Sequence, residues 1–154
     1  PYVALIGNHD ILGNGKEVFE QVYGDENFAF IAGNTKFVCM NTNALEYDYS
    51  HPVPDFDFIS REAADSARYS KTVAVMHVKP YDDQFNNNVA RLFHAEIKKF
   101  PSLQFALHAH NHKLQTTDVF KDGIIYYGCA SMKQRNYMVF TLTTNGYSYE
   151  VVNY

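Results

Sequence analysis

The sequence has little of several features that would place the protein in a special class. Its only two cysteines, Cys39 and Cys129, each lie within an apolar run, so we expect two buried thiols. The net charge is −4, and no basic stretch indicates binding to a nucleic-acid backbone. No apolar stretch approaches the length of a membrane span, which favours a soluble domain without a membrane-spanning segment.

The remaining composition is that of an ordinary globular domain. Hydrophobic residues make up 46% and charged residues 19% of 154 positions, which fits one domain over 1–154. The chain opens at Pro1 and passes directly into an apolar run, so we interpret its start as a cut. The compartment therefore stays open, because a targeting segment would have been lost with the missing part.

Apolar periodicity predicts an α/β fold in which strands and helices alternate and an antiparallel run follows. The run Tyr2–Ile6 is expected to be a strand buried on both faces. The helix at 13–24 should bury Val18, Phe19 and Val22. The other expected helices are 55–67, capped by Asp55 or Asp57, and 86–100, and the other expected strands are 27–31, 36–41, 72–76, 103–107, 114–120, 124–128, 137–142 and 147–152.

Polar clusters follow three of the expected buried strands. Asn8-His9-Asp10 comes after the first, His77 after the second, and the segment from His108 to His112 after the third. In open α/β sheets ligands bind beyond the carboxyl ends of the strands. The three clusters are therefore predicted to meet in space.

These residue types suit a metal centre. Imidazole is the commonest metal ligand, and the spacing of His110 and His112 can place one imidazole on each of two metals. Asn8 offers a neutral oxygen ligand. His9 beside Asp10 is interpreted as an orienting pair in which the carboxylate holds the imidazole.

Simpler interpretations exist for each cluster alone. Asn-His-Asp after a glycine is also typical of a turn, and a single histidine at a strand end is more often structural. For His51 and His94 we favour a surface or packing role. The combination of three clusters behind three buried strands favours a functional site.

Three motifs, in order, resemble those of the calcineurin-like metallophosphoesterases, and the resemblance covers essentially the whole chain. The segment from Gly7 to Asp10 matches the family's G-N-H-D/E motif. His77 resembles its isolated metal-binding histidine. The segment from Ala109 to His112 is similar to its G-H-x-H motif, with Ala109 in the glycine position, a change that disfavours a positive φ there.

The resemblance implies a two-sheet sandwich flanked by helices and two divalent transition-metal ions, with Mn, Fe or Zn expected. Asn8, His77 and His110 would bind one metal, and His112 would bind the other. His9 would be catalytic, facing the phosphate of a small phosphorylated substrate, with Asp10 holding it. The expected activity is hydrolysis of phosphate monoesters or diesters.

Two of the family's motifs are absent from this sequence. No Asp is followed two residues later by His, and no G-D pair follows a buried strand, so the carboxylate that bridges the metals is missing. We therefore expect this chain to be the C-terminal part of the family's domain. It should be weak or inactive alone, with Tyr2–Ile6 covered by an N-terminal fragment, a second copy or a rearranged local segment.

Two other functions were weighed. A non-catalytic domain could retain the fold for binding or assembly. A metal-free hydrolase using His9 and Asp10 would leave His77, His110 and His112 without a role. The substrate is not identified by the sequence, although Tyr47, Tyr49 and Tyr81 lie in loops that could border a cleft.

Overall fold

The computed structural model describes residues 2–44 and 52–154 and contains two β-sheets. The larger sheet has six strands in the order β1-β2-β3-β4-β6-β5, and the smaller consists of β7 and β8. Their bounds are β1 Phe28–Ala32, β2 Thr35–Met40, β3 Lys71–Met76, β4 Leu103–His108, β5 Gln115–Asp118, β6 Ile125–Gly128, β7 Asn136–Thr143 and β8 Gly146–Asn153. The expected α/β class with two sheets is confirmed.

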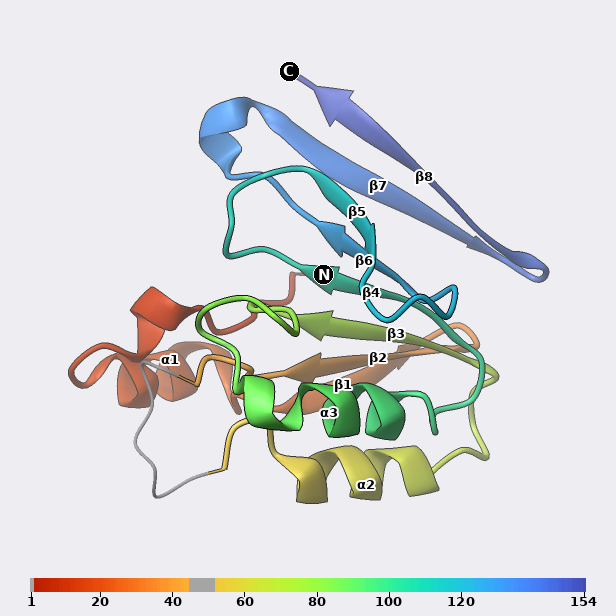
Figure 1. The fold of residues 1–154 in the computed structure, drawn as a ribbon, viewed down its shortest axis with the longest axis horizontal. Helices are drawn as coiled ribbons and strands as arrows, with labels where there is room; N and C mark the ends of the chain where they lie inside the picture. The colour runs from red at the N-terminus through yellow and green to blue at the C-terminus, as the bar shows by residue number, and fades with distance from the viewer. Residues whose placement is uncertain (1, 45–51) are drawn as a thin grey trace.

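Helices α2 (Phe56–Ala64) and α3 (Ala90–Ile97) cover one face of the six-stranded sheet, and the β7–β8 hairpin lies on the other side of the molecule (Figure 1). Helix α1 (Gly15–Tyr23) and the short 3-10 helix η1 (Asn8–Ile11) lie at one end of the sheet. Two further 3-10 helices are η2 (Asn87–Val89) and η3 (Met132–Gln134).

The central strands are parallel, and this sets where the site lies. β2, β3, β4 and β6 run parallel to their neighbours in that order, whereas β1 and β5 are antiparallel at the two edges. The β1–β2 hairpin turns at Gly33, whose φ of 62° suits a residue without a Cβ. The parallel arrangement brings the carboxyl ends of β3 and β4, at Met76 and His108, to one edge.

The segment expected to form the first buried strand does not form one. Residues 2–7 have no regular structure, and Tyr2 and Val3 are 82% and 46% exposed. A strand requires a neighbour for its backbone N–H and C=O groups, and residues 2–7 pair with no strand of the two described sheets. Of residues 2–7, Ile6 and Gly7 are buried, and Ile6 packs in a small cluster with Ile11 and Phe19.

Each of the three expected helices differs from its predicted form, and α3 covers only Ala90–Ile97 of the expected 86–100, after the 3-10 helix η2. In α1 only Phe19 is buried, while Val18 and Val22 are 48% and 65% exposed, so the predicted buried face was wrong for those two valines. Helix α2 ends at Ala64, three residues early. Its start is as predicted, since the Asp55 carboxylate accepts the N–H of Phe58 at 2.9 Å.

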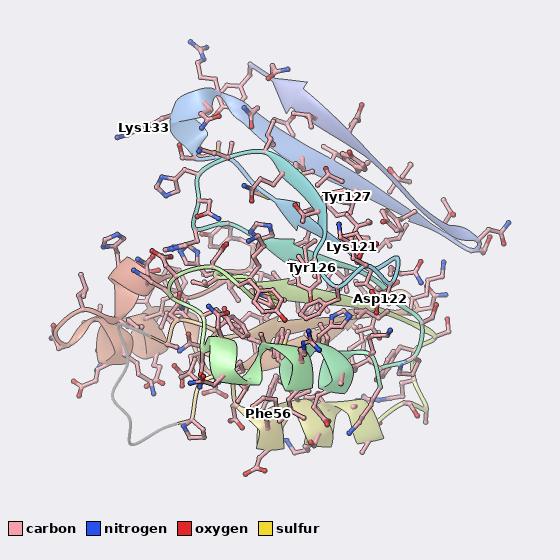
Figure 2. All side chains as sticks on the ribbon, in the orientation of Figure 1. Phe56, Lys121, Asp122, Tyr126, Tyr127 and Lys133 are labelled. Atoms are coloured by element: carbon pink, nitrogen blue, oxygen red, sulfur yellow. The ribbon has the colours of Figure 1, made fainter. Side chains whose placement is uncertain are left out.

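The core is divided by the large sheet, and β6 shows this directly. Figure 2 shows Tyr126 and Tyr127 on opposite sides of the strand. Tyr126 is fully buried toward α3, where its hydroxyl lies 2.9 Å from Nδ1 of His94. Tyr127 packs on the other side against Phe140 of β7, at a ring distance of 5.1 Å. The hairpin is therefore held on the sheet by aromatic contacts.

The buried His94 is part of a polar network that joins α3 to the β5–β6 connection. Its Nε2 lies 2.9 Å from the Asp122 carboxylate, which also binds the ammonium of Lys98. The predicted packing role of His94 is confirmed, whereas His51, Tyr47 and Tyr49 lie outside the described residues. Of the two cysteines, Cys39 is buried and Cys129 is half-buried.

Within 2–44 and 52–154, the helices are all too short or too polar to cross a membrane.

Candidate metal centre

Asn8 and His77 are in direct contact at one end of the large sheet. The amide oxygen of Asn8 lies 3.0 Å from Nε2 of His77. Asn8 belongs to η1 and is 5% exposed, and His77 directly follows β3. Although residues 2–7 form no strand, Ile6 anchors this segment, and Asn43 donates an amide hydrogen to the Ile6 carbonyl at 3.1 Å. Asn8 therefore reaches the strand end without belonging to the sheet.

His110 lies beside this pair. The rings of His77 and His110 are 5.5 Å apart between centroids and meet edge to face. The backbone N–H of Ala109 donates to the His77 carbonyl at 3.0 Å, which continues the β3–β4 pairing past the strand ends. The structure thus brings Asn8, His77 and His110 together from three segments of the sequence.

The segment after β4 has an unusual backbone. His110 and His112 have φ values of 56° and 54°, in the left-handed region that residues with a Cβ seldom adopt. Ala109 is not among the described residues with positive φ, so the alanine in the family's glycine position carries no strain. Backbone outliers of this kind persist where surrounding contacts fix them, and they are frequent at functional sites.

Burial keeps His77 neutral. Removal from water and the neighbouring His110 lower the pKa of His77 to about 4. His112 and His9 lower it further, and the Asp10 carboxylate partly opposes them, so all three groups lie close enough to act on the ring. A neutral imidazole has the lone pair that a metal ligand needs.

His108 is the most buried residue of the histidine segment. It is 2% exposed, and burial followed by the charge of Lys79 lowers its pKa to about 4. Its Nε2 lacks a hydrogen-bond partner within the described residues, and its ring lies against Gly128. His108 therefore packs inside the fold, behind the exposed histidines.

His9, Asp10 and His112 occupy the solvent side of the cluster, and all three are exposed. The Asp10 carboxylate accepts the N–H of Gly7 at 2.8 Å, closing the turn that carries Asn8 and His9. Among the described residues it makes no hydrogen bond with His9, so the expected direct pairing is not formed. His112 accepts a hydrogen bond from Gln134 at its carbonyl, which leaves its imidazole outside that contact.

Sequence reasoning missed the acidic residues beside the histidines. Asp82 binds the ammonium of Lys79 and accepts a hydrogen bond from Asn111 Nδ2 at 2.9 Å. Asp83 lies 3.1 Å from Nε2 of His110, and this hydrogen bond lowers the pKa of Asp83. Their sequence context is a polar loop with no periodicity, and only the following Asn-rich segment marks it as irregular.

The donor atoms suit a divalent ion: one amide oxygen and the nitrogens of His77 and His110. In the part of the chain that the structure describes, no three His, Cys, Asp or Glu side chains are gathered as a group that could hold a metal as they stand. Comparison with known proteins gives no match: no protein-family model fits the chain, and no curated protein sequence is similar to it.

Proposed function

We propose that this chain carries part of the binuclear metal centre of a calcineurin-like metallophosphoesterase, an enzyme that hydrolyses phosphate esters. The observation that supports this function most directly is the 3.0 Å contact between Asn8 Oδ1 and His77 Nε2, with His110 beside it. These are one residue from each of the three motifs that resemble the family's. The arrangement of two sheets with helices on one face is compatible with that family's sandwich.

The proposed ligands are those that the resemblance implies, and the contacts of His77 with Asn8 and His110 support the first three. Asn8, His77 and His110 bind one divalent transition-metal ion, Mn, Fe or Zn, and His112 contributes to a second. Two metal ions held there would polarise a phosphoryl oxygen and activate a water molecule. The chain's part is to hold an amide oxygen and neutral imidazoles at the carboxyl ends of two strands.

His9 and Asp10 have different tasks in this proposal. His9 is exposed beside Asn8, so its imidazole is available to the substrate and can give a proton to the leaving oxygen. Asp10 supports His9 through the backbone, because its carboxylate binds Gly7 N–H and closes the turn on which His9 lies. Asp10 is therefore a positioning residue for the catalytic histidine.

The carboxylate ligands of the binuclear centre have to come from elsewhere. This sequence has no D-x-H motif and no G-D pair after a strand, so the second metal has only His112 here. We propose that another polypeptide segment supplies the bridging carboxylate, and that the 154-residue chain alone is weak or inactive as an enzyme. The 154-residue chain alone is expected to bind one metal ion.

Metal titration of the chain tests this proposal. Zn²⁺ and Mn²⁺ binding is measured by competition with a chromophoric chelator, for the chain and its His77→Ala variant. We expect binding of one ion and its loss in the variant. Equal affinity of both proteins would overturn the proposal and favour a non-catalytic domain that retains the fold.

Turnover is measured separately, on p-nitrophenyl phosphate and bis-p-nitrophenyl phosphate. The protein assayed is the one encoded by the complete natural reading frame. Hydrolysis that requires added metal and is lost in His77→Ala would support the enzyme. The preferred ester distinguishes a monoesterase from a diesterase.

A further inference from the structure

Within residues 2–44 and 52–154, Asp83 and His110 form the one hydrogen-bonded contact in the candidate centre between a carboxylate and a proposed metal-binding histidine. Asp83 Oδ1 lies 3.1 Å from Nε2 of His110. The His110 side chain is 12% exposed, whereas that of Asp83 is 79% exposed. The contact therefore lies at the rim of the site, with the imidazole inside and the carboxylate facing water.

The contact selects one of the two ring nitrogens of His110. A neutral imidazole carries one proton, and a carboxylate accepts a hydrogen bond from the nitrogen that holds it. With Nε2–H donated to Asp83, the lone pair is on Nδ1. No hydrogen bond to Nδ1 of His110 is formed within 2–44 and 52–154. Nδ1 is thus the ring nitrogen open to a metal ion.

The loop that carries Asp83 is fixed by a neighbouring contact. The preceding residue, Asp82, binds Lys79 and accepts from Asn111 Nδ2 at 2.9 Å. The Asp82 and Lys79 side chains are only 10% and 13% exposed. Two consecutive acidic residues therefore contact the side chains of two consecutive residues of the histidine segment, His110 and Asn111.

We propose that Asp83 is a positioning residue for His110: it accepts Nε2–H, fixes the tautomer and leaves Nδ1 as the metal-binding nitrogen. This inference rests on the proposed function, because it assigns His110 to a metal. Metal-binding histidines commonly donate their other ring nitrogen to a carboxylate, and loss of that partner lowers metal affinity about 10- to 100-fold. Asp83 lies outside all three sequence motifs.

Stability measurements distinguish a positioning role of Asp83 from a structural role, because a structural role would lower the melting temperature when the carboxylate is removed. An exposed ion pair contributes little to the stability of a fold. Removing the Asp83 carboxylate should therefore leave the melting temperature unchanged while changing metal affinity and the state of the His110 ring. Stability and metal affinity together separate positioning from packing.

The test compares three variants of the 154-residue chain. Asp83→Ala removes the acceptor, and Asp83→Glu restores a carboxylate. Asp57→Ala is the matched control, since Asp57 is an exposed aspartate on α2. Zn²⁺ affinity is measured by chelator competition. We expect about a tenfold or larger loss in Asp83→Ala, recovery to within about threefold in Asp83→Glu, and no change in Asp57→Ala. Unchanged affinity in Asp83→Ala would overturn the inference.

Long-range ¹H–¹⁵N spectra of the histidine rings give a second readout without metal. His110 should carry its proton on Nε2 in the unaltered chain and should lose that preference in Asp83→Ala. A proton on Nδ1 in the unaltered chain would overturn the inference even if zinc binds. If the unaltered chain and His77→Ala bind zinc equally, the proposed function itself fails, which is a different outcome from failure of Asp83 alone.

Discussion

The amide oxygen of Asn8 lies 3.0 Å from Nε2 of His77, although 69 positions separate the two residues in the sequence. Without metal, the amide oxygen accepts a hydrogen bond from Nε2–H of His77. Two donor atoms that bind one ion at about 2.0–2.2 Å are about 3 Å apart when the angle at the ion is near 90°, so the same spacing would suit two adjacent ligands. The contact joins the 3-10 helix η1 to the residue that follows β3. It therefore provides the first point at which to test the site.

Substitutions at His77 and His9 should separate metal binding from catalysis. We expect His77→Ala to lose zinc, because it removes a ligand, and His9→Asn to keep most of it, because His9 is exposed and assigned to the substrate. Metal content is measured by mass spectrometry after dialysis. Where the protein is active, His9→Asn should lower turnover by about 10²–10⁴-fold, as loss of a general acid does. Equal metal loss in both variants would contradict the assigned roles.

Cys39 should be unreactive in the folded chain. Burial raises its pKa to about 12, so about one thiol in 10⁴ is ionised at pH 8. Burial also raises the pKa of Cys129, which is half-buried. We expect a thiol-reactive dye to label Cys129 slowly and Cys39 more slowly still, and to label both at once in denaturant.

A Cys129→Ser variant isolates Cys39 and provides the control for this labelling. Its single thiol should be protected until the chain unfolds. Rapid labelling of that variant under native conditions would show that β2 opens readily, because Cys39 is 2% exposed in the folded chain.

Asp122 should stabilise the fold in a pH-dependent way. The ammonium of Lys98, and then His94, hold the pKa of Asp122 well below its usual range. A carboxyl with a lowered pKa stabilises the fold fully above its unfolded pKa of about 3.9. This contribution begins to fall below that pH and is lost as the pH falls through the lower pKa of the folded chain. Asp122→Asn should thus cost about 1 kcal/mol at pH 7, a low figure because the side chain is a quarter exposed.

Urea unfolding at pH 7 and at pH 3 measures this difference, with Asp57→Asn as a control for removal of an exposed carboxylate. The difference between the midpoints of Asp122→Asn and the unaltered chain should be smaller at pH 3 than at pH 7, because at pH 3 the carboxyl of the unfolded chain is mostly protonated while that of the folded chain is still ionised. The explanation would be wrong if the difference in unfolding midpoint between Asp122→Asn and the unaltered chain increased at low pH.

The sequence predicted the parts of this fold that depend on local pattern. The apolar runs that became β3 and β4 end at His77 and His108 as expected. The run Tyr2–Ile6 has the same composition but no neighbouring strand, and composition does not reveal whether a partner exists. The hydrophobic pattern therefore predicts where strands and helices form, but it does not predict which strands pair.

The site was predictable in the same limited way. Histidines behind apolar runs indicated which segments meet, but the partner Asp83 was not indicated. Asp83 is an exposed carboxylate in a loop, and its partner His110 lies 27 positions further along the chain. Contacts of this kind depend on how loops fold over strand ends, which leaves no periodic signal in the residues themselves.

Ile6 should be the residue that ties the candidate centre to the fold, and Val3 provides its control. Ile6 is fully buried with Ile11 and Phe19, two positions before Asn8, whereas Val3 is 46% exposed in the same irregular segment. Ile6→Ala removes buried methyl and methylene groups and leaves a cavity, at a cost of about 2–4 kcal/mol. Val3→Ala should change stability by less than about 0.5 kcal/mol.

The effect of Ile6→Ala should extend to metal binding. The small cluster around Ile6 holds η1, and η1 carries Asn8 against His77. When the cluster loosens, Asn8 samples positions away from His77, so zinc affinity should fall in Ile6→Ala and stay unchanged in Val3→Ala. Both quantities are measured under conditions where the variant is still folded, as judged by circular dichroism. A folded Ile6→Ala chain that binds zinc as tightly as Val3→Ala would show that Asn8 is held by other contacts, and would remove Ile6 from the support of the site.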